Sequence, residues 1–225
     1  MNYSKLSTFN FQLSTFNFFA AALFAAMTSA TTAAQAQTAR QVLDATAARM
    51  TQQGPVQADF KVTQFSGTTP QSEVSGTMIV DGSKYIMTTP ELQTWYNGTL
   101  QWSMQTGSDE VNLLQPTPEE NAVANPAAIV GIYRQGYNAT MTDGTLRGRA
   151  THVVHLQATK SDAEFSEIYI DTERSTYTPL CIRAKHNGDW TRLSIYDFRK
   201  ASKTKAADFE FPKKKYPDVE IIDLR

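Results

Sequence analysis

The sequence predicts a mainly β fold of the α+β class, built on one strongly curved antiparallel sheet of about ten strands. Apolar and polar residues alternate over most of the chain, which is the pattern of half-buried strands. Dipeptides that favour tight turns separate the alternating runs at short intervals. Because an open sheet of this size usually curls, we expect an unclosed barrel whose concave side is covered by helices.

An amphipathic helix is expected at the start of the folded part, over residues 38–53. Four apolar residues lie on one stripe of this helix: Ala39, Leu43, Ala47 and Met50. The pair Gly54-Pro55 ends the pattern, because proline cannot continue a helix.

After Pro55 the period of the pattern changes to two, which is typical of strands. The first strand has its apolar residues on one face: Val56, Ala58, Phe60 and Val62. Alternation recurs in residues 74–80, 100–104 and 191–198, and further strands are predicted at 136–142, 151–159, 165–171, 177–185, 190–199, 207–211 and 218–223. Turns are predicted at Ser66-Gly67, Asp81-Gly82, Asn97-Gly98, Thr106-Gly107, Asp143-Gly144 and Asn187-Gly188. Short turns between alternating runs predict one meandering sheet.

Residues 116–134 interrupt the alternation. Pro116 and Pro118 are incompatible with a central strand. Asn125 and Pro126 have the properties of a helix N-cap and of a first helical residue, so we expect a short apolar helix from 126 to 134. This helix needs an apolar surface to cover, and the sheet offers one.

The first 36 residues have the properties of a secretory signal peptide. The apolar run at 18–30 is followed by Ala34-Gln35-Ala36, a small-x-small cleavage signal, and Lys5 is the one charge before it. A membrane anchor is the alternative, but the run is shorter than the roughly 20 residues that a spanning helix needs. We therefore expect one mature domain, residues 37–225, that is soluble after export.

Charge and composition exclude several classes of function. The formal net charge is −1, and removing Lys5 makes it more negative, which argues against nucleic acid as a partner. Cys181 is the one cysteine and has no histidine near it in the sequence, so we expect a buried thiol and not a nucleophile. His152 and His155 point to opposite faces of a strand and cannot chelate one metal ion. With no catalytic motif present, we expect a protein that is not an enzyme and has no metal or cofactor.

The stretch "YIMTTPELQTWYNGTLQWSM", residues 85–104, is rich in aromatic side chains and methionine. These side chains have two alternative roles. They fill an ordinary core, or they line an adaptable apolar cavity, which methionine suits because flexible thioethers specify a rigid core poorly. Face parity assigns these residues to a cavity for acyl chains: Phe60, Val62, Met78, Val80, Met87, Leu100, Trp102, Met104, Ile129 and Ile132. A register shift of one residue would exchange each lining residue for its neighbour.

Several segments together resemble a known family. They are "ADFKVTQF", "GTMIVDGSKYIM", "TWYNGTLQWSM", "NPAAIVGIY" and "DFEFPKKKYPDVEIIDLR". In these motifs and in the order of its elements, the chain resembles the LolA-type periplasmic carriers of outer-membrane lipoproteins, in the form found in Bacteroides-type bacteria. The resemblance implies an unclosed barrel of eleven strands with three covering helices and a cavity for lipoprotein acyl chains. It also implies a monomer whose partners are acylated lipoproteins, an inner-membrane ATP-driven release complex and an outer-membrane acceptor.

One segment departs from the family pattern. Better-known members have Arg-Pro after the strand that matches "GTMIV", and that arginine locks the lid of the empty protein. Asp81-Gly82-Ser83 stands here instead. The lid lock must therefore be absent or differently made. Two alternatives to the carrier stay open: an interaction or sensor module of the same fold, and an enzyme acting on lipid or cell wall, for which no nucleophile and base are evident.

Overall fold

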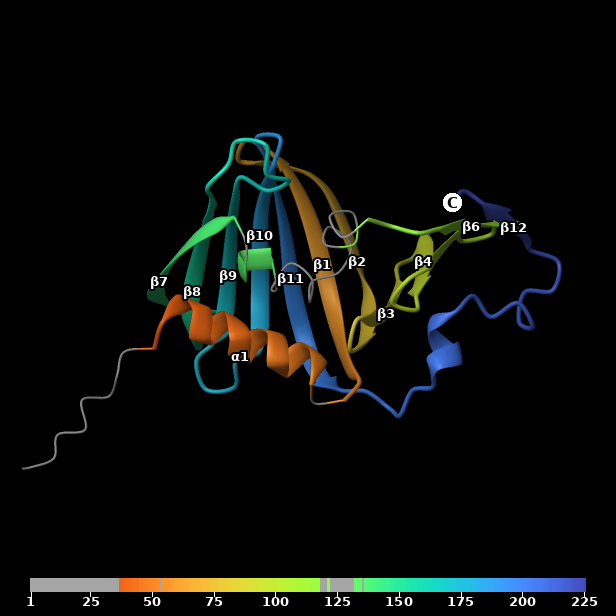
Figure 1. The fold of residues 1–225 in the computed structure, drawn as a ribbon, viewed down its shortest axis with the longest axis horizontal. Coiled ribbons are helices and arrows are strands. Elements are labelled where there is room, and N and C mark those ends of the chain that lie inside the picture. Colours follow the sequence, from red (N-terminus) through yellow and green to blue (C-terminus); the bar gives the residue numbers. More distant parts are fainter. Residues whose placement is uncertain (1–36, 53, 118–120, 122–131, 135) are drawn as a thin grey trace, which may run out of the picture. The chain divides into compact units, whose positions relative to one another are not determined.

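The structure is a computed structural model that describes residues 37–52, 54–117, 121, 132–134 and 136–225 (Figure 1). Residues from Gln37 onward form one compact unit. The predicted signal peptide lies outside the described residues. So does most of the helix predicted at 126–134, including Ile129.

The described residues contain one α-helix, two short 3-10 helices and one sheet of twelve strands. The helices are α1 (Ala39–Thr51), η1 (Ile132–Arg134) and η2 (Ala206–Phe209). The strands are β1 (Val56–Ser66), β2 (Thr69–Asp81), β3 (Lys84–Thr88), β4 (Leu92–Tyr96), β5 (Gln101–Gln105), β6 (Glu110–Leu114), β7 (Tyr137–Leu146), β8 (Arg149–Ala158), β9 (Glu167–Glu173), β10 (Pro179–His186), β11 (Asp189–Lys200) and β12 (Glu220–Asp223). Their order in the sheet is β12-β6-β5-β4-β3-β2-β1-β11-β10-β9-β8-β7. The predicted fold class, a curved and unclosed antiparallel sheet, is confirmed.

Three details differ from the predictions. The sheet has twelve strands where about ten were predicted, and β12, which lies within the strand predicted at 218–223, runs parallel to β6. The strand predicted at 207–211 is wrong, because Ala206–Phe209 forms the 3-10 helix η2. The turn predicted at Asp143-Gly144 is also wrong: both residues lie within β7, opposite His152 and Thr151 of β8.

The turn between β7 and β8 instead lies at Arg147-Gly148, where both residues have positive φ, 50° and 75°. This is the backbone that a two-residue hairpin turn requires. Gly144 lies within β7, where a Cβ would come within 2.8 Å of the Val153 side chain. Its lack of a side chain therefore serves packing and not a turn.

Helix α1 covers one face of the sheet, which we call the inner face (Figure 1). Thr38 and Gln41 form a capping box that starts the helix. Val42, Leu43 and Met50 are buried against β8, β9 and β10, in the cluster that holds Val154, Ile168 and Ile182. Thr46 is fully buried and contacts Thr172 of β9 through their hydroxyl oxygens, 3.1 Å apart. The helix is thus fixed by an apolar stripe and one polar contact.

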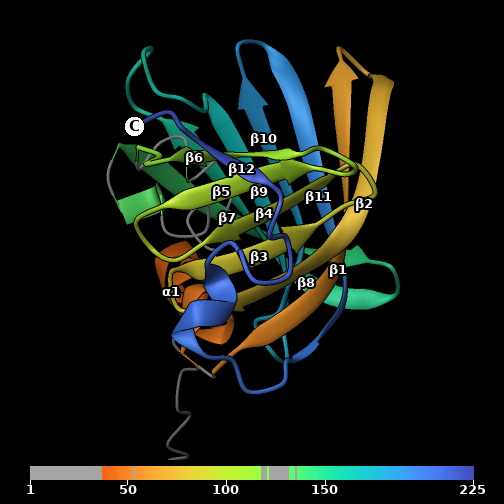
Figure 2. The same ribbon diagram turned by 90° about the vertical axis from the view of Figure 1, so that its right-hand side faces the viewer.

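The opposite, outer face of β3 to β6 is covered by the C-terminal segment, residues 201–219. Figure 2 shows this segment, with η2, passing in front of these strands on its way to β12. Phe211, Tyr216 and Val219 of the segment pack against a cluster on the strands: Ile86, Trp95, Leu100, Trp102, Met104, Val111 and Leu113. The ring of Phe211 meets Trp95 edge-on at 5.5 Å and stacks on Tyr216 at 5.6 Å. The apolar side chains on the outer face of β3 to β6 are therefore buried.

This arrangement explains much of the aromatic stretch at 85–104. Trp95 pairs with Trp102, and Tyr85 pairs with Tyr96. Because successive residues of a strand point to opposite faces, the tryptophans lie on the outer face and the tyrosines on the inner face. The outer half of the stretch is core beneath the C-terminal segment.

Replacing Phe211 by Ala is expected to lower the free energy of unfolding by about 3 kcal/mol, because a buried ring is removed from a packed cluster. Urea unfolding followed by tryptophan fluorescence measures the change. Leu224→Ala is the control, since Leu224 is 56% exposed and its truncation should cost less than about 0.5 kcal/mol. Equal and small effects of both changes would mean that the C-terminal segment does not stabilise the sheet.

Candidate functional site

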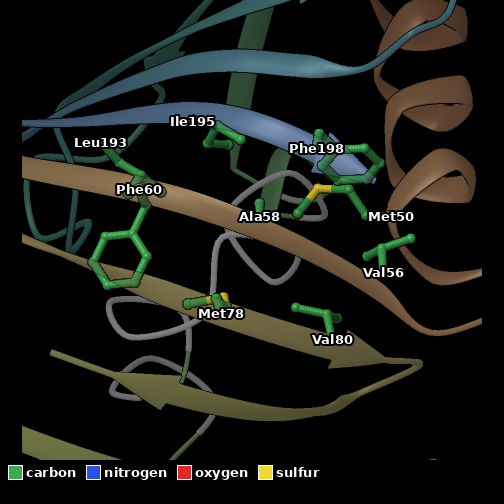
Figure 3. A pocket seen from close by; sticks show the side chains of 9 residues that line it. All are labelled: Met50, Val56, Ala58, Phe60, Met78, Val80, Leu193, Ile195 and Phe198. Atoms are coloured by element: carbon green, nitrogen blue, oxygen red, sulfur yellow. The ribbon is translucent and has the colours of Figure 1, made fainter. Parts of the chain in front are cut away.

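A small apolar cavity lies on the inner face between α1 and the middle of the sheet. Nine side chains line it: Met50 of α1, Val56, Ala58 and Phe60 of β1, Met78 and Val80 of β2, and Leu193, Ile195 and Phe198 of β11 (Figure 3). Every one of these side chains is apolar. The cavity volume is about 30 Å³, which is room for a water molecule or two and not for a chain of carbons.

The register of β1 with its two neighbours creates this lining. Phe60 pairs with Ile195 of β11, and Ala58 pairs with Met78 of β2. Residues that pair directly point to the same face, so three strands present their apolar side chains together. β1 and β2 are neighbours in the sequence, whereas β11 is more than a hundred residues away and meets them because it pairs with β1.

A bulge in β11 adds the last lining residue. The register with β1 shifts between Gln57 and Asp59, and Asp197 has a φ of 43°. The extra residue brings Phe198 to the same face as Ile195, although three positions separate them. Strict alternation would have put Phe198 on the outer face.

The structure brings only part of the predicted cavity set together. Phe60, Met78 and Val80 line the cavity, and Val62 and Met87 pack against the same cluster. Ile132 lies in η1 and packs against the cluster under α1 instead. Ile129 lies outside the described residues.

Leu100, Trp102 and Met104 do not share the face of the other predicted residues, and that part of the prediction is corrected. Met87 pairs with Thr94, whereas Met104 pairs with the adjacent Gln93. Neighbouring residues of a strand face opposite sides, so Met87 and Met104 lie on different faces. All three of the misplaced residues belong to the cluster beneath the C-terminal segment.

Six lining residues were not in the predicted set: Met50, Val56, Ala58, Leu193, Ile195 and Phe198. Val56 and Ala58 alternate with Phe60 in the sequence, so the pattern contained a signal for them. Leu193 and Ile195 show the same alternation. They reach the cavity because β11 pairs with β1, and this long-range pairing cannot be predicted from the sequence of either strand alone.

Beyond the cavity the inner face becomes polar. The Tyr85 hydroxyl donates to Gln101 at 2.9 Å, and the Gln101 amide donates to the Ser103 hydroxyl at 3.2 Å. Burial raises the pKa of Tyr85 well above its usual range, so this phenol stays neutral and keeps its proton for the hydrogen bond. These hydrogen-bonded side chains mark the end of the apolar surface on the inner face.

Groups for bond-making chemistry are not gathered at the cavity. Across the described ranges no three metal-ligating side chains come together. His152 contacts Asp143 at 3.2 Å, whereas His155 stacks on Tyr169 on the opposite face, as predicted from their spacing. Cys181 is buried, and burial raises the pKa of its thiol, which makes it a poor nucleophile.

Two further features bear on the site. Asp81, which stands where better-known family members have an arginine, accepts a hydrogen bond from Thr204 of the C-terminal segment at 2.7 Å. This position is therefore joined to the C-terminal segment.

Within the described ranges, no helix has the length and hydropathy to cross a membrane.

Solved structures of several other proteins align with most of this chain. An uncharacterized conserved protein from Thermus thermophilus aligns over 83% of this chain and 99% of that chain, with a TM-score of 0.57 and 10% identity. A LolA superfamily protein from Nitrosomonas europaea aligns over 78% and 99%, with a TM-score of 0.43 and 11% identity. MucB of Pseudomonas aeruginosa, in its complex with MucA, aligns over 82% and 63%, with a TM-score of 0.46 and 10% identity.

A search of curated proteins finds no match. At the level of families the match is clear and covers most of the chain, including α1, the cavity residues of β1 and β2, and the strands up to β10. Residues 29–188 match the outer membrane lipoprotein carrier protein LolA, and the chain belongs to this family.

Proposed function

We propose that this protein is a periplasmic carrier that shields the acyl chains of outer-membrane lipoproteins against the inner face of its sheet. The observation that carries the proposal is the wholly apolar lining between α1 and strands β1, β2 and β11. An acyl chain offers no hydrogen bonds, so a surface without polar groups suits it and suits few other ligands. Membership of the family supports the same function.

The size of the cavity sets a condition on this function. A space of about 30 Å³ holds no acyl chain, so uptake requires the parts around the cavity to separate. Met50 reaches the cavity from the last turn of α1, and the guanidinium of Arg49 lies over the Phe198 ring at 5.4 Å. We infer that α1 moves away from the sheet when cargo enters.

The energies make such a movement compatible with transport. Burying a chain of sixteen carbons gains roughly 0.8 kcal/mol per CH₂, or about 12 kcal/mol. Exposing Val42, Leu43 and Met50 by lifting α1 costs roughly 1.5–3 kcal/mol for each side chain, or about 5–9 kcal/mol together. The remaining few kcal/mol hold the cargo and still allow its release to a tighter acceptor.

The other parts of the proposal follow from the family. The mature protein, residues 37–225, acts as one monomeric domain after removal of the signal peptide. It receives acylated lipoproteins from an ATP-driven release complex of the inner membrane and passes them to an acceptor in the outer membrane. Its part in this transfer is binding, with no chemical step and no cofactor.

Met78 and Met104 provide a matched pair of positions for testing the binding face. Both are 7% exposed, but Met78 lines the cavity and Met104 lies on the outer face. Met78→Gln is expected to weaken binding of a fluorescent sixteen-carbon fatty acid about tenfold, because an amide then replaces apolar contact with the chain. Met104→Gln should change this affinity by less than about twofold.

Urea unfolding of both variants accompanies the binding titration. The same kind of side chain is lost at the same burial, so we expect similar losses of stability. If both variants bind the fatty acid equally well or equally badly, the inner face is not the binding face.

The movement of α1 can be tested by fixing the helix to the sheet. The hydroxyl oxygens of Thr46 and Thr172 are 3.1 Å apart, so a pair of cysteines at these positions is close enough for a disulfide. The oxidised Thr46→Cys/Thr172→Cys variant is expected to take up the fatty acid at least about tenfold more weakly than the reduced variant. Adding a reductant should restore uptake, and equal uptake in both redox states would show that the helix does not open.

A further inference from the structure

A second concave site lies on the outer face, on the opposite side of the sheet from the cavity. It is a groove of about 430 Å³, within the usual range for ligand sites. Its lining is Phe65, Gly67, Thr68, Tyr169, Arg183, Trp190 and Arg192. Leu193 lines the inner cavity and follows Arg192 directly in β11, so the two sites lie back to back across one sheet.

The strand register places two arginines directly opposite each other in this groove. Arg183 of β10 pairs with Arg192 of β11. Like charges in such a pair destabilise a sheet unless a counter-charge lies between them. Asp171 supplies one carboxylate, which accepts a hydrogen bond from Arg183 at 3.0 Å. Among the described residues, one of the two guanidinium groups is therefore left without a carboxylate in contact with it.

That guanidinium belongs to Arg192. Its hydrogen bond to the Thr63 hydroxyl is long, 3.5 Å, and its Nε is buried without a hydrogen-bond partner among the described residues. A buried donor without an acceptor costs free energy, so an oxygen from a ligand would be stabilised here.

The nearby carboxylates are already engaged with other cations. Glu73 accepts hydrogen bonds from Lys61 at 3.1 Å, and this contact holds the pKa of Glu73 below its usual value, with only a small part from Arg192. Glu167 contacts Lys185 at 3.2 Å and His155 at 3.4 Å. The groove thus keeps an excess of positive charge.

Aromatic rings hold both guanidinium groups in place. Arg183 lies over the Tyr169 ring at 4.8 Å, and Arg192 lies over the Phe65 ring at 5.0 Å. Trp190 is the third aromatic residue of the groove, and its ring centroid is 5.9 Å from that of Tyr169. Stacking fixes the planar fork of an arginine and leaves its edge available for an anion.

We propose that this groove binds a peptide segment of a partner protein through an Asp or Glu side chain that pairs with Arg192, next to an aromatic or aliphatic residue. Charge complementarity selects the carboxylate. Tyrosine, tryptophan and arginine are the residues in which protein-binding energy concentrates, which favours a peptide. Gly67 and Thr68 of the adjacent β1–β2 turn are exposed and border the groove. Because the acyl cavity is on the other face, partner and cargo can be bound together.

The probe is the capped peptide acetyl-Gly-Glu-Phe-Glu-Gly-amide, titrated into the ¹⁵N-labelled protein, residues 37–225, and followed by NMR. We expect saturable shifts of the Trp190 indole N–H and of the backbone amides of Gly67 and Thr68. The same peptide with Gln in place of both Glu residues is expected to bind about tenfold more weakly. Equal affinity of the two peptides, or no saturable shift, would overturn the proposal.

The matched variants are Arg192→Gln and Arg149→Gln, which remove the same charge inside and outside the groove. Arg149 lies on β8, 55% of its side chain is exposed, and its partner is Glu173 at 3.8 Å. Arg192→Gln should weaken the Glu peptide about tenfold and Arg149→Gln less than about twofold. Equal weakening would overturn the proposal. So would Arg192-dependent binding to phosphatidylglycerol vesicles without binding of the peptide, because the groove would then recognise a membrane surface.

Discussion

The pairing of β1 with both β2 and β11 is the constraint on which the rest of the structure depends. It joins the strands β2 to β6 and β12 to the strands β7 to β11, and so makes one sheet from two parts of the chain. It also decides what each face presents. Phe60, Met78 and Ile195 meet on the inner face, whereas Phe65 and Trp190 meet on the outer face. A change of one residue in this register would exchange the two surfaces.

The two ends of the sheet are covered by different layers. Under α1, the helix covers the inner face, and the outer face carries charged side chains such as Arg183 and Lys185. In β3 to β6 the C-terminal segment covers the apolar outer face, while the inner face holds Tyr85 and Tyr96 and, on β5, the polar Gln101 and Ser103. This second cover lies beyond residue 188, where the family match ends. Thr204 joins it to Asp81 at the end of β2, close to the cavity residue Val80.

Much of the fold could be predicted from the sequence, because alternation and turn residues are local signals. The opening helix, most strands and the curvature follow from them. The cavity could be predicted only in part. Phe60, Met78 and Val80 lie in strands whose apolar face lines the cavity, whereas the apolar face of β5, with Trp102 and Met104, meets the C-terminal segment on the other side of the sheet. Alternation shows that one face of a strand is buried, but it does not show which layer covers that face. The contribution of Phe198 depends on a bulge, and that of Leu193 on a long-range pairing, neither of which is a local property.

Native mass spectrometry of the mature protein purified from the periplasm tests most directly whether acyl chains bind on the inner face. Anything bound is extracted and identified, and the protein is then mixed with detergent-solubilised lipoprotein. If acyl chains bind there, we expect adducts with the mass of acylated lipoprotein or fatty acid, lost in Met78→Gln and kept in Met104→Gln. A clean mass without uptake on mixing would contradict binding on the inner face, because the apolar lining would then be ordinary core.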